Sequence, residues 1–246
     1  MGLAAGRQQR LALVLTEETP MPRTRIKICG LTRAEDVQTV VAAGADAIGF
    51  VFYAKSPRYV TPEQAAGLVA AMPPYVSAVG LFVNASVEEV RAIAAVAPLS
   101  LLQFHGDETP GHSAAIASAV NTPFVQVFRV KPDTSAEDLL EYEQRYRAAS
   151  PLFSGLLLDT YVDAYGGAGK VFDWSLVPEE LAPRVVLSGG LSVHNATDAV
   201  VRVRPYAVDI SSGVEASKGI KDASRIRAFV AAVQDADAII ARGTTP

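Results

Sequence analysis

The sequence predicts a single domain of the α/β class, a (β/α)8 or TIM barrel, in which eight parallel strands are ringed by helices. The chain has 246 residues, a length at which such barrels form one unit. From residue 25 onward, short apolar runs alternate eight times with helical stretches. A doubly wound open sheet is the alternative. It is disfavoured because eight strands and eight helices in strict alternation close naturally into a ring.

The expected strands are rich in valine, isoleucine, leucine and phenylalanine, the composition that strands covered on both faces require. Amphipathic or alanine-rich stretches separate them. The expected strands are residues 25–29, 45–52, 76–83, 99–104, 124–128, 155–159, 185–188 and 207–210.

Two of the helices expected between these strands carry sequence signals for their first turn. Thr32 precedes the first helix, with Glu35 three residues later, which is the spacing of a capping box. Thr61 precedes Pro62, and proline is favoured at the first helical position. The expected helices are residues 34–43, 62–71, 87–96, 110–119, 136–149, 174–181, 193–202 and 223–241.

Residues 1–24 precede the first expected strand and are predicted to be a disordered extension, so that the catalytic domain spans residues 25–246. Two arginines come before a short apolar patch at residues 11–15, as in some targeting signals. The patch is too short for a signal peptide, and two glutamates follow it.

The composition limits the class of partner. Half of the residues are hydrophobic, and 22 basic residues stand against 26 acidic ones, a formal charge of -4. This balance disfavours a nucleic-acid or anionic-membrane surface, and no apolar run approaches the length of a membrane span. Cys29 is the only cysteine, which excludes an intrachain disulfide and favours a reducing compartment, the cytoplasm.

Cys29 ends the first expected strand, where barrels of this class place active-site side chains. Side-chain alternation puts Cys29 and Lys27 on the inward face, while Ile26 and Ile28 face the helices. A cation two residues away favours the thiolate and predicts a Cys29 pKa below its free value. The alternative is a buried cysteine with a packing role only.

Asp159 ends the apolar strand at residues 155–159. A carboxylate there is costly to desolvate unless it is paired or takes part in the chemistry, so it is an active-site candidate. A helix N-cap or a loop ion pair is the alternative. The glycine-rich loop that follows, residues 164–170, is placed to close over a ligand.

Two loops are candidates for phosphate binding. They follow the seventh and eighth strands, the places where these barrels most often hold a phosphate. Small residues in such loops let backbone N–H groups approach an anion closely, although chain reversal alone also explains them. The residues concerned are Gly189, Gly190, Ser211, Ser212 and Gly213.

Lys27 is a candidate for a substrate contact, and so are four more side chains. Gln103 and His105 share the inward face of the fourth strand, where His105 is either a ligand contact or an ordinary core histidine. Arg58 follows the second strand in a Ser-Pro-Arg turn and suits a carboxylate or phosphate, unless it is a solvated loop residue. Asp209, on the eighth strand, either orients a sugar hydroxyl or balances Lys27.

The sequence predicts neither a metal site nor a cofactor. The three histidines at positions 105, 112 and 194 are scattered, and neither a Walker loop nor a dinucleotide fingerprint occurs. We therefore expect cofactor-independent chemistry on a small phosphorylated molecule.

Taken together, these segments resemble the phosphoribosylanthranilate isomerase family. The motifs occur in the family's order and span residues 27–215, a much more specific match than any one of them. They are Lys27-Ile28-Cys29-Gly30-Leu31-Thr32, Gly49-Phe50-Val51-Phe52 with Ser56-Pro57-Arg58, Gln103-Phe104-His105-Gly106, Leu158-Asp159 with Gly166-Gly167-Ala168-Gly169, Phe172-Asp173-Trp174, Ser188-Gly189-Gly190-Leu191 and Asp209-Ile210-Ser211-Ser212-Gly213-Val214-Glu215.

The resemblance implies an Amadori-type conversion of an aldose to a ketose in tryptophan biosynthesis, acting on N-(5-phosphoribosyl)anthranilate. It implies that Asp159 is the general acid, that Cys29 is the general base and that Arg58 faces the anthranilate carboxylate. The expected partner is this small phosphosugar, and the protein is expected to be a monomer or a homodimer. Another phosphosugar-binding barrel enzyme and a non-catalytic phosphate-ligand sensor are the alternative functions.

The chain departs from the family pattern at three of these positions. Ala168 stands where threonine or serine is usual, which removes a hydroxyl from the glycine-rich loop. Phe104 replaces leucine and Ser188 replaces alanine, both as tolerated packing changes. None of the three removes a proposed catalytic group.

Overall fold

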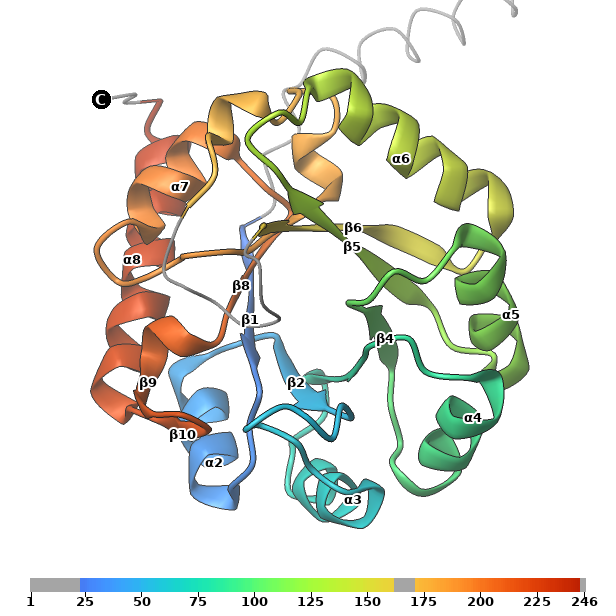
Figure 1. Cartoon of the computed structure of the whole chain (residues 1–246). Coiled ribbons are helices and arrows are strands. Elements are labelled where there is room, and N and C mark those ends of the chain that lie inside the picture. Colours follow the sequence, from blue (N-terminus) through green and yellow to red (C-terminus); the bar gives the residue numbers. More distant parts are fainter. Residues whose placement is uncertain (1–22, 162–170, 244–246) are drawn as a thin grey trace, which may run out of the picture.

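Eight parallel strands form a closed ring in the order β1-β2-β3-β4-β5-β6-β7-β8. The computed structural model describes residues 23–161 and 171–243, and Figure 1 shows the strands at the centre of this part of the chain with helices around them. β1 pairs with both β2 and β8, so the ring has no open edge. The predicted barrel is therefore confirmed, and the open sheet is excluded.

All eight predicted strands are present, with ends that shift by up to two residues. β5 and β6 are longer than expected because they remain paired up to Val130 and Thr160. The bounds are β1 Arg25–Cys29, β2 Ala47–Val51, β3 Ser77–Phe82, β4 Leu101–Phe104, β5 Phe124–Val130, β6 Phe153–Thr160, β7 Val186–Leu187 and β8 Ala207–Ile210.

Seven of the eight predicted helices are present. The expected helix at 174–181 is wrong: the segment contains only the 3-10 turn η1, Trp174–Leu176, and a second turn η2, Ala182–Arg184, follows. Val177 precedes a proline and is extended, which ends η1. The helices are α2 Ala34–Ala43, α3 Pro62–Ala70, α4 Val87–Val96, α5 Pro110–Val120, α6 Ala136–Ala149, α7 Ala196–Val203 and α8 Ala223–Ala241.

One of the two predicted helix starts has the expected cap. Thr61 caps α3 and forms a capping box with Gln64. Thr32 does not cap α2, because Arg33 is the residue before the helix and no side chain caps it. The Thr32 hydroxyl instead donates to the Gly219 carbonyl at 2.9 Å.

Gly219 belongs to a small hairpin between β8 and α8. The 3-10 turn η3, Ser212–Val214, leads into β9, Glu215–Ser217, which pairs in antiparallel fashion with β10, Ile220–Lys221. Strands of two and three residues are too short for an alternation pattern, and the sequence did not predict them.

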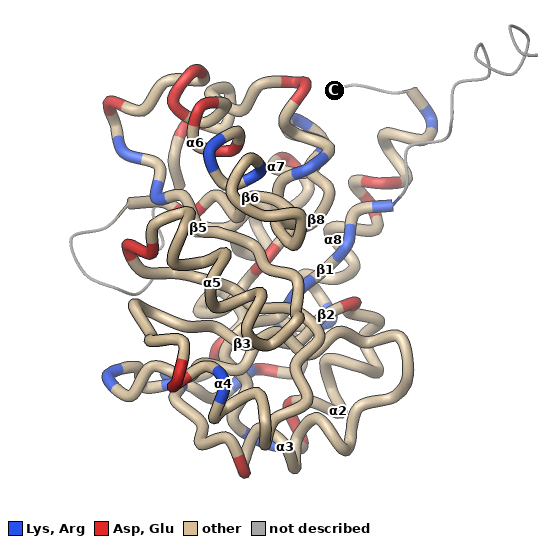
Figure 2. The backbone as a smooth tube through the Cα atoms, turned by 90° about the vertical axis from the view of Figure 1, so that its right-hand side faces the viewer, with Lys and Arg blue, Asp and Glu red and all other residues tan. Residues whose placement is uncertain are grey.

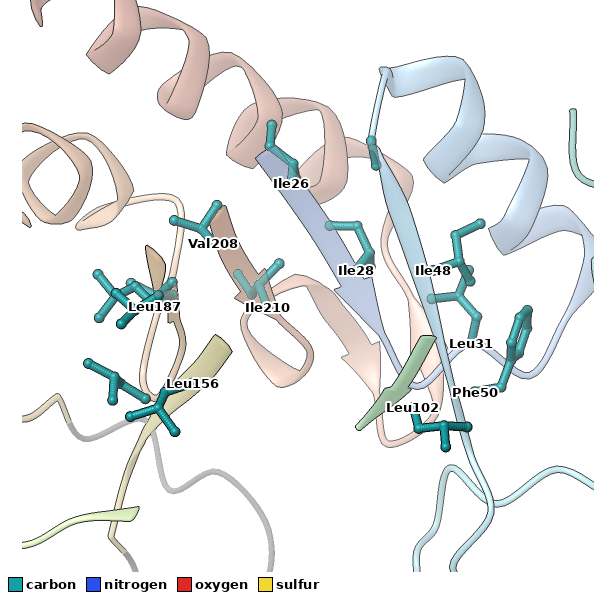
Figure 3. Packing of buried hydrophobic residues seen from close by; sticks show 14 of the residues in the cluster. Ile26, Ile28, Leu31, Ile48, Phe50, Leu102, Leu156, Leu187, Val208 and Ile210 are labelled. Carbon is teal, nitrogen blue, oxygen red and sulfur yellow. The ribbon is translucent and has the colours of Figure 1, made fainter. Parts of the chain in front are cut away.

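The main core lies between the strand ring and the helices. Ile28, Ile48 and Val208 point outward from their strands and are fully buried there (Figure 3). One sector of this layer is a row of five phenylalanines that touch in sequence. Their centroid distances are 5.3 Å for Phe52–Phe82, 6.4 Å for Phe82–Phe104, 5.5 Å for Phe104–Phe124 and 5.6 Å for Phe124–Phe153.

The barrel contacts begin two residues earlier than predicted. The Thr24 hydroxyl donates to Asp237 of α8 at 2.7 Å, and Arg23 pairs with Asp46. These contacts correct the expected boundary, because Arg23 and Thr24 were assigned to the extension. Residues 1–22 lie outside the described part of the chain.

Acidic and basic residues are interspersed on the side of the molecule that Figure 2 shows. Over residues 23–161 and 171–243, none of the helices has the length and apolar content to cross a membrane.

Candidate active site

A pocket lies at the carboxyl ends of the strands. Of the twelve site residues predicted from the sequence, all except Lys27 line it. They come from β1, β4, β6 and β8 and from the loops after β2, β4, β7 and β8. Tyr53 and Lys55, to which the sequence assigned no role, and Ser188, which was interpreted only as a packing change, line the same pocket. The loop at 164–170 and its Ala168 fall outside the described residues.

Cys29 occupies space that the neighbouring strand leaves open. It pairs with Gly49 of β2, and a Cβ atom on Gly49 would lie 2.7 Å from Sγ of Cys29. Val51 and Leu81 complete a small cluster on the inner side of the ring. Cys29 is 5% exposed and lines the pocket, so it is not sealed off within the core.

Replacing Gly49 with alanine is expected to displace the thiol, because real side chains do not tolerate a carbon 2.7 Å from sulfur. We expect a loss of about 1–3 kcal/mol in the free energy of unfolding, typical of overpacking, and a fall in kcat/KM of at least about tenfold. Thermal unfolding and steady-state kinetics measure the two effects. Gly67→Ala is the matched control, since a Cβ there meets nothing within 4 Å. Equal behaviour of the two variants would show that the space beside the thiol is unimportant.

Lys27 lies below the pocket floor and pairs with Asp209. Nζ of Lys27 donates to Oδ2 of Asp209 at 2.8 Å, and both side chains are less than a tenth exposed. The structure thus shows Asp209 balancing Lys27. Oδ1 of Asp209 is buried without a hydrogen-bond partner among the described residues, and Asp209 lines the pocket. This oxygen is therefore able to accept from a ligand hydroxyl.

The predicted direction of the Cys29 pKa is wrong. Burial raises the pKa of the Cys29 thiol, and this effect exceeds the opposing effect of Lys27. Asp209 reinforces the rise because it brings a negative charge close to the thiol, whereas Lys221 opposes it. The sequence-based prediction of the pKa counted the Lys27 cation alone; it included neither the burial of the thiol nor the charge of Asp209, although Asp209 was named as a candidate partner of Lys27.

Asp159 is held by a histidine. Nε2 of His105 lies 3.2 Å from Oδ2 of Asp159, and Nδ1 of His105 lies 3.1 Å from Nε2 of Gln103. The amide nitrogen of Gln103 donates when Nδ1 carries no proton, which leaves Nε2–H to donate to the carboxylate. Gln103 and His105 thus lie together at the rim and orient Asp159.

The two predicted phosphate loops lie against each other and beside Asp159. Gly189 has a φ of +77°, and a Cβ there would come within 2.8 Å of Oδ1 of Asp159. Gly190 also has a positive φ, +69°. A Cβ on Gly213 would lie 2.3 Å from the Leu191 carbonyl oxygen. These close approaches require glycine and bring the backbone of both loops to one side of the pocket.

Arg58 is not a solvated loop residue. Its Nε and Nη2 donate to the two carboxylate oxygens of Glu215 at 2.6 and 2.8 Å, and its side chain is 15% exposed. The side-chain stem passes over Gly30, where a Cβ would meet Cδ of Arg58 at 2.4 Å. Arg58 therefore lies across the strand end that carries Cys29, with one edge of its guanidinium fixed.

Lys221 of β10 lies beneath this arrangement and was not predicted. Its side chain has no solvent exposure, and Nζ donates to Oε1 of Glu215 at 3.0 Å and to the Ser211 carbonyl at 3.0 Å. No sequence signal pointed to Lys221, because the hairpin that carries it was not expected. In the residues that the structure describes, no group of three or more His, Cys, Asp or Glu side chains is placed to hold a metal ion.

The chain matches the model of the N-(5'-phosphoribosyl)anthranilate isomerase family over residues 26–232. A similar protein is the N-(5'-phosphoribosyl)anthranilate isomerase of Herminiimonas arsenicoxydans, 71% identical, with 91% of this chain and 98% of the relative covered. The isomerase of Ralstonia nicotianae is 53% identical, with 90% and 97% covered.

Solved structures agree with this match. The crystal structure of the Thermotoga maritima phosphoribosyl anthranilate isomerase has a TM-score of 0.76 and 40% identity, covering 86% of this chain and 99% of that chain. A phosphoribosyl anthranilate isomerase in complex with reduced 1-(o-carboxyphenylamino)-1-deoxyribulose 5-phosphate has a TM-score of 0.71 and 37% identity, over the same shares. From its sequence match and its fold, the chain belongs to the N-(5'-phosphoribosyl)anthranilate isomerase family.

Proposed function

We propose that this protein converts N-(5-phosphoribosyl)anthranilate to 1-(2-carboxyphenylamino)-1-deoxyribulose 5-phosphate in tryptophan biosynthesis, with Asp159 as general acid and Cys29 as general base. The observation that carries the proposal is that one pocket is lined by the thiol, the carboxyl group, Arg58 and both phosphate loops. A substrate with a carboxylate at one end and a phosphate at the other matches this distribution of cationic and N–H groups.

The first step is proton donation by Asp159. The protonated acid gives its proton to the ribose ring oxygen, the C1–O bond breaks, and the electron pair of the anthranilate nitrogen forms an iminium with C1. His105 suits this change because a neutral imidazole accepts from the acid or donates to the carboxylate, according to its tautomer. The Gln103 amide is able to serve either tautomer, since its nitrogen donates to a bare Nδ1 and its oxygen accepts from Nδ1–H.

The second step is proton removal by Cys29. The thiolate takes the proton from C2, the electron pair of the C2–H bond forms the C1–C2 double bond, and the iminium becomes a neutral enolamine. Tautomerisation of the enolamine then gives the ketone. The acid must start protonated and the base ionised, so their surroundings must favour opposite charge states.

The remaining contacts hold the two ends of the substrate. We assign the free guanidinium edge of Arg58 to the anthranilate carboxylate, since the other edge is occupied by Glu215. Backbone N–H groups of Gly189, Gly190, Ser211 and Gly213, with the side chain of Ser212, are assigned to the phosphate. Lys27 acts through Asp209, whose unpaired Oδ1 is assigned to a substrate hydroxyl.

We further propose that the protein works in the cytoplasm, because a single catalytic thiol requires a reducing environment. Monomer and homodimer both stay predictions for this chain. The Thermotoga maritima phosphoribosylanthranilate isomerase is described as dimeric, and monomers have been generated from it.

The decisive experiment is a coupled fluorescence assay that follows the loss of phosphoribosylanthranilate on addition of the purified protein. We expect turnover that is saturable in substrate and requires no added metal or cofactor. The alternative function, a non-catalytic phosphate-ligand sensor, would replace the proposal if the folded protein binds inorganic phosphate but phosphoribosylanthranilate disappears no faster than in the uncatalysed background.

A further inference from the structure

Charged side chains are concentrated in the lining of the pocket and directly next to it. Lys27 pairs with Asp209, and Glu215 bonds to both Arg58 and Lys221. We call these five residues the charge cluster. Among the described residues it contains three cations and two carboxylates, so it carries one surplus positive charge.

Lys221 is the most deeply buried cation of the cluster, with no exposed side-chain surface, whereas Lys27 and Arg58 are 9% and 15% exposed. Burial lowers the pKa of Lys221, and the carboxylate of Glu215 opposes this shift. Burial also acts to raise the pKa of Glu215, but Arg58 and Lys221 outweigh it and keep the carboxyl group ionised. A buried cation of this kind is retained in a fold only where its surroundings use the charge or satisfy its donors.

Lys221 reaches Cys29 through one residue. Its Nζ donates to the carbonyl oxygen of Ser211 at 3.0 Å and contacts the hydroxyl oxygen of Ser211 at 3.3 Å. That hydroxyl donates to the carbonyl oxygen of Cys29 at 3.0 Å. The hairpin lysine thus fixes a residue of the phosphate loop that is hydrogen-bonded to the strand end bearing the thiol.

Lys27 alone does not supply the positive charge that a thiolate at position 29 needs, because Asp209 neutralises it at 2.8 Å. Arg58 and Lys221, both bonded to Glu215, are further charged groups near Cys29. Tyr53 packs against the cluster of Cys29, Val51 and Leu81, and Lys55, Asp159 and His105 line the same pocket. The surplus positive charge therefore comes from the other part of the cluster, in which the two cations Arg58 and Lys221 share the single carboxylate of Glu215.

We propose that Lys221 is a positioning residue for the isomerisation: it fixes Ser211 beneath Cys29 and gives the charge cluster the surplus that favours the Cys29 thiolate. The inference rests on the proposed role of Cys29 as the base. Its direct effect, on the ionisation of the thiol, does not depend on which substrate the enzyme takes.

The test is alkylation of Cys29 by iodoacetamide as a function of pH, in the full chain without substrate. Cys29 is the only cysteine, so the rate reports on this thiolate alone. Lys221→Met keeps the length of the side chain and removes its charge. We expect the alkylation midpoint to rise by about one pH unit, and kcat at neutral pH to fall by about tenfold. The kcat deficit should shrink as the pH is raised above the new midpoint.

Two further variants separate charge from structure. Lys218→Met removes a lysine from the exposed tip of the same hairpin, and its midpoint should stay at the wild-type value. Glu215→Gln keeps the shape of the side chain and removes a negative charge. Its midpoint should fall by about one pH unit. A purely structural role of the hairpin predicts the same direction of change in Lys221→Met and Glu215→Gln, whereas the proposal predicts opposite directions.

The proposal is overturned if folded Lys221→Met has the same alkylation midpoint as Lys218→Met, or if Glu215→Gln shifts the midpoint upward or not at all. If Lys221→Met does not fold, Glu215→Gln decides the question alone. Opposite shifts in a protein that fails to turn over phosphoribosylanthranilate would uphold the effect of Lys221 on the Cys29 thiolate and reject the proposed reaction, so the two failures are distinguishable.

Discussion

Replacing Asp159 with asparagine is expected to lower kcat on the order of 10³-fold while KM changes little. The amide keeps the size of the carboxyl group, and its oxygen accepts a hydrogen bond from His105 at the position now taken by Oδ2. An amide does not donate a proton to the ring oxygen, and loss of a general acid typically costs between 10²- and 10⁴-fold. The loss corresponds to about 4 kcal/mol of transition-state stabilisation. Steady-state assays over a range of substrate concentrations measure it.

The control for this variant is Asp133→Asn, which removes a carboxylate from an exposed loop position after β5. Its kinetics should match those of the wild type, and both variants should unfold at the wild-type temperature. An Asp159→Asn enzyme that retained full kcat would exclude Asp159 as the acid. A variant that lost only affinity would make Asp159 a substrate contact.

Replacing Cys29 with alanine is expected to abolish measurable turnover, again on the order of 10³-fold or more, because no other group on the first strand is placed to take the C2 proton. The fold should persist, because the side chain removed is small and belongs to the cluster with Val51 and Leu81 inside the ring, which is separate from the main core. Binding of inorganic phosphate should also persist, because the phosphate loops follow β7 and β8 rather than β1.

Cys29→Ser is the matched comparison, because it restores a hydroxyl of similar size that does not ionise in the working pH range. It should be as inactive as Cys29→Ala. In the wild type, activity should rise with pH as the thiol ionises, at a higher pH than for an exposed cysteine, since burial raises the pKa of Cys29. Substantial activity in the serine variant would mean that the position requires a hydrogen bond rather than a base.

The barrel could be predicted from the sequence because its signals are local. Each strand is a short run rich in valine, isoleucine, leucine or phenylalanine, and each confirmed helix has its own spacing of apolar residues. The helix expected at residues 174–181 failed for an equally local reason that was overlooked, since Val177 precedes a proline and takes an extended conformation.

Features that depend on distant residues could not be predicted in the same way. Thr32 had the spacing of a cap, but its hydroxyl bonds to Gly219, which lies 187 residues later in the chain. Arg58 could be assigned to the pocket from its turn, whereas its partner Glu215 follows 157 residues later. Lys221 lies on a strand of two residues that has no pattern of its own.

The direction of the Cys29 pKa shows the same limit for energetics. Alternation correctly placed Lys27 on the inward face with the thiol, and a cation alone favours the thiolate. The net effect also depends on the depth of burial and on the Asp209 carboxylate, which pairs with Lys27 across the closure of the ring between β1 and β8. Neither the depth of burial of Cys29 nor the position of the Asp209 carboxylate next to Lys27 can be read from the residues around Cys29.

The row of phenylalanines has a consequence for how the ring opens. From Phe52 to Phe153 each aromatic side chain touches the next, so this arc resists opening as one cooperative unit. β7, Val186–Leu187, is the shortest strand of the ring, and we expect amide protons to exchange first at its pairings with β6 and β8. The loop that follows β7 is assigned to the phosphate, and a ligand that binds only the closed ring adds to its stability. Closure of the ring at β7 and binding of the ligand are therefore expected to be thermodynamically coupled.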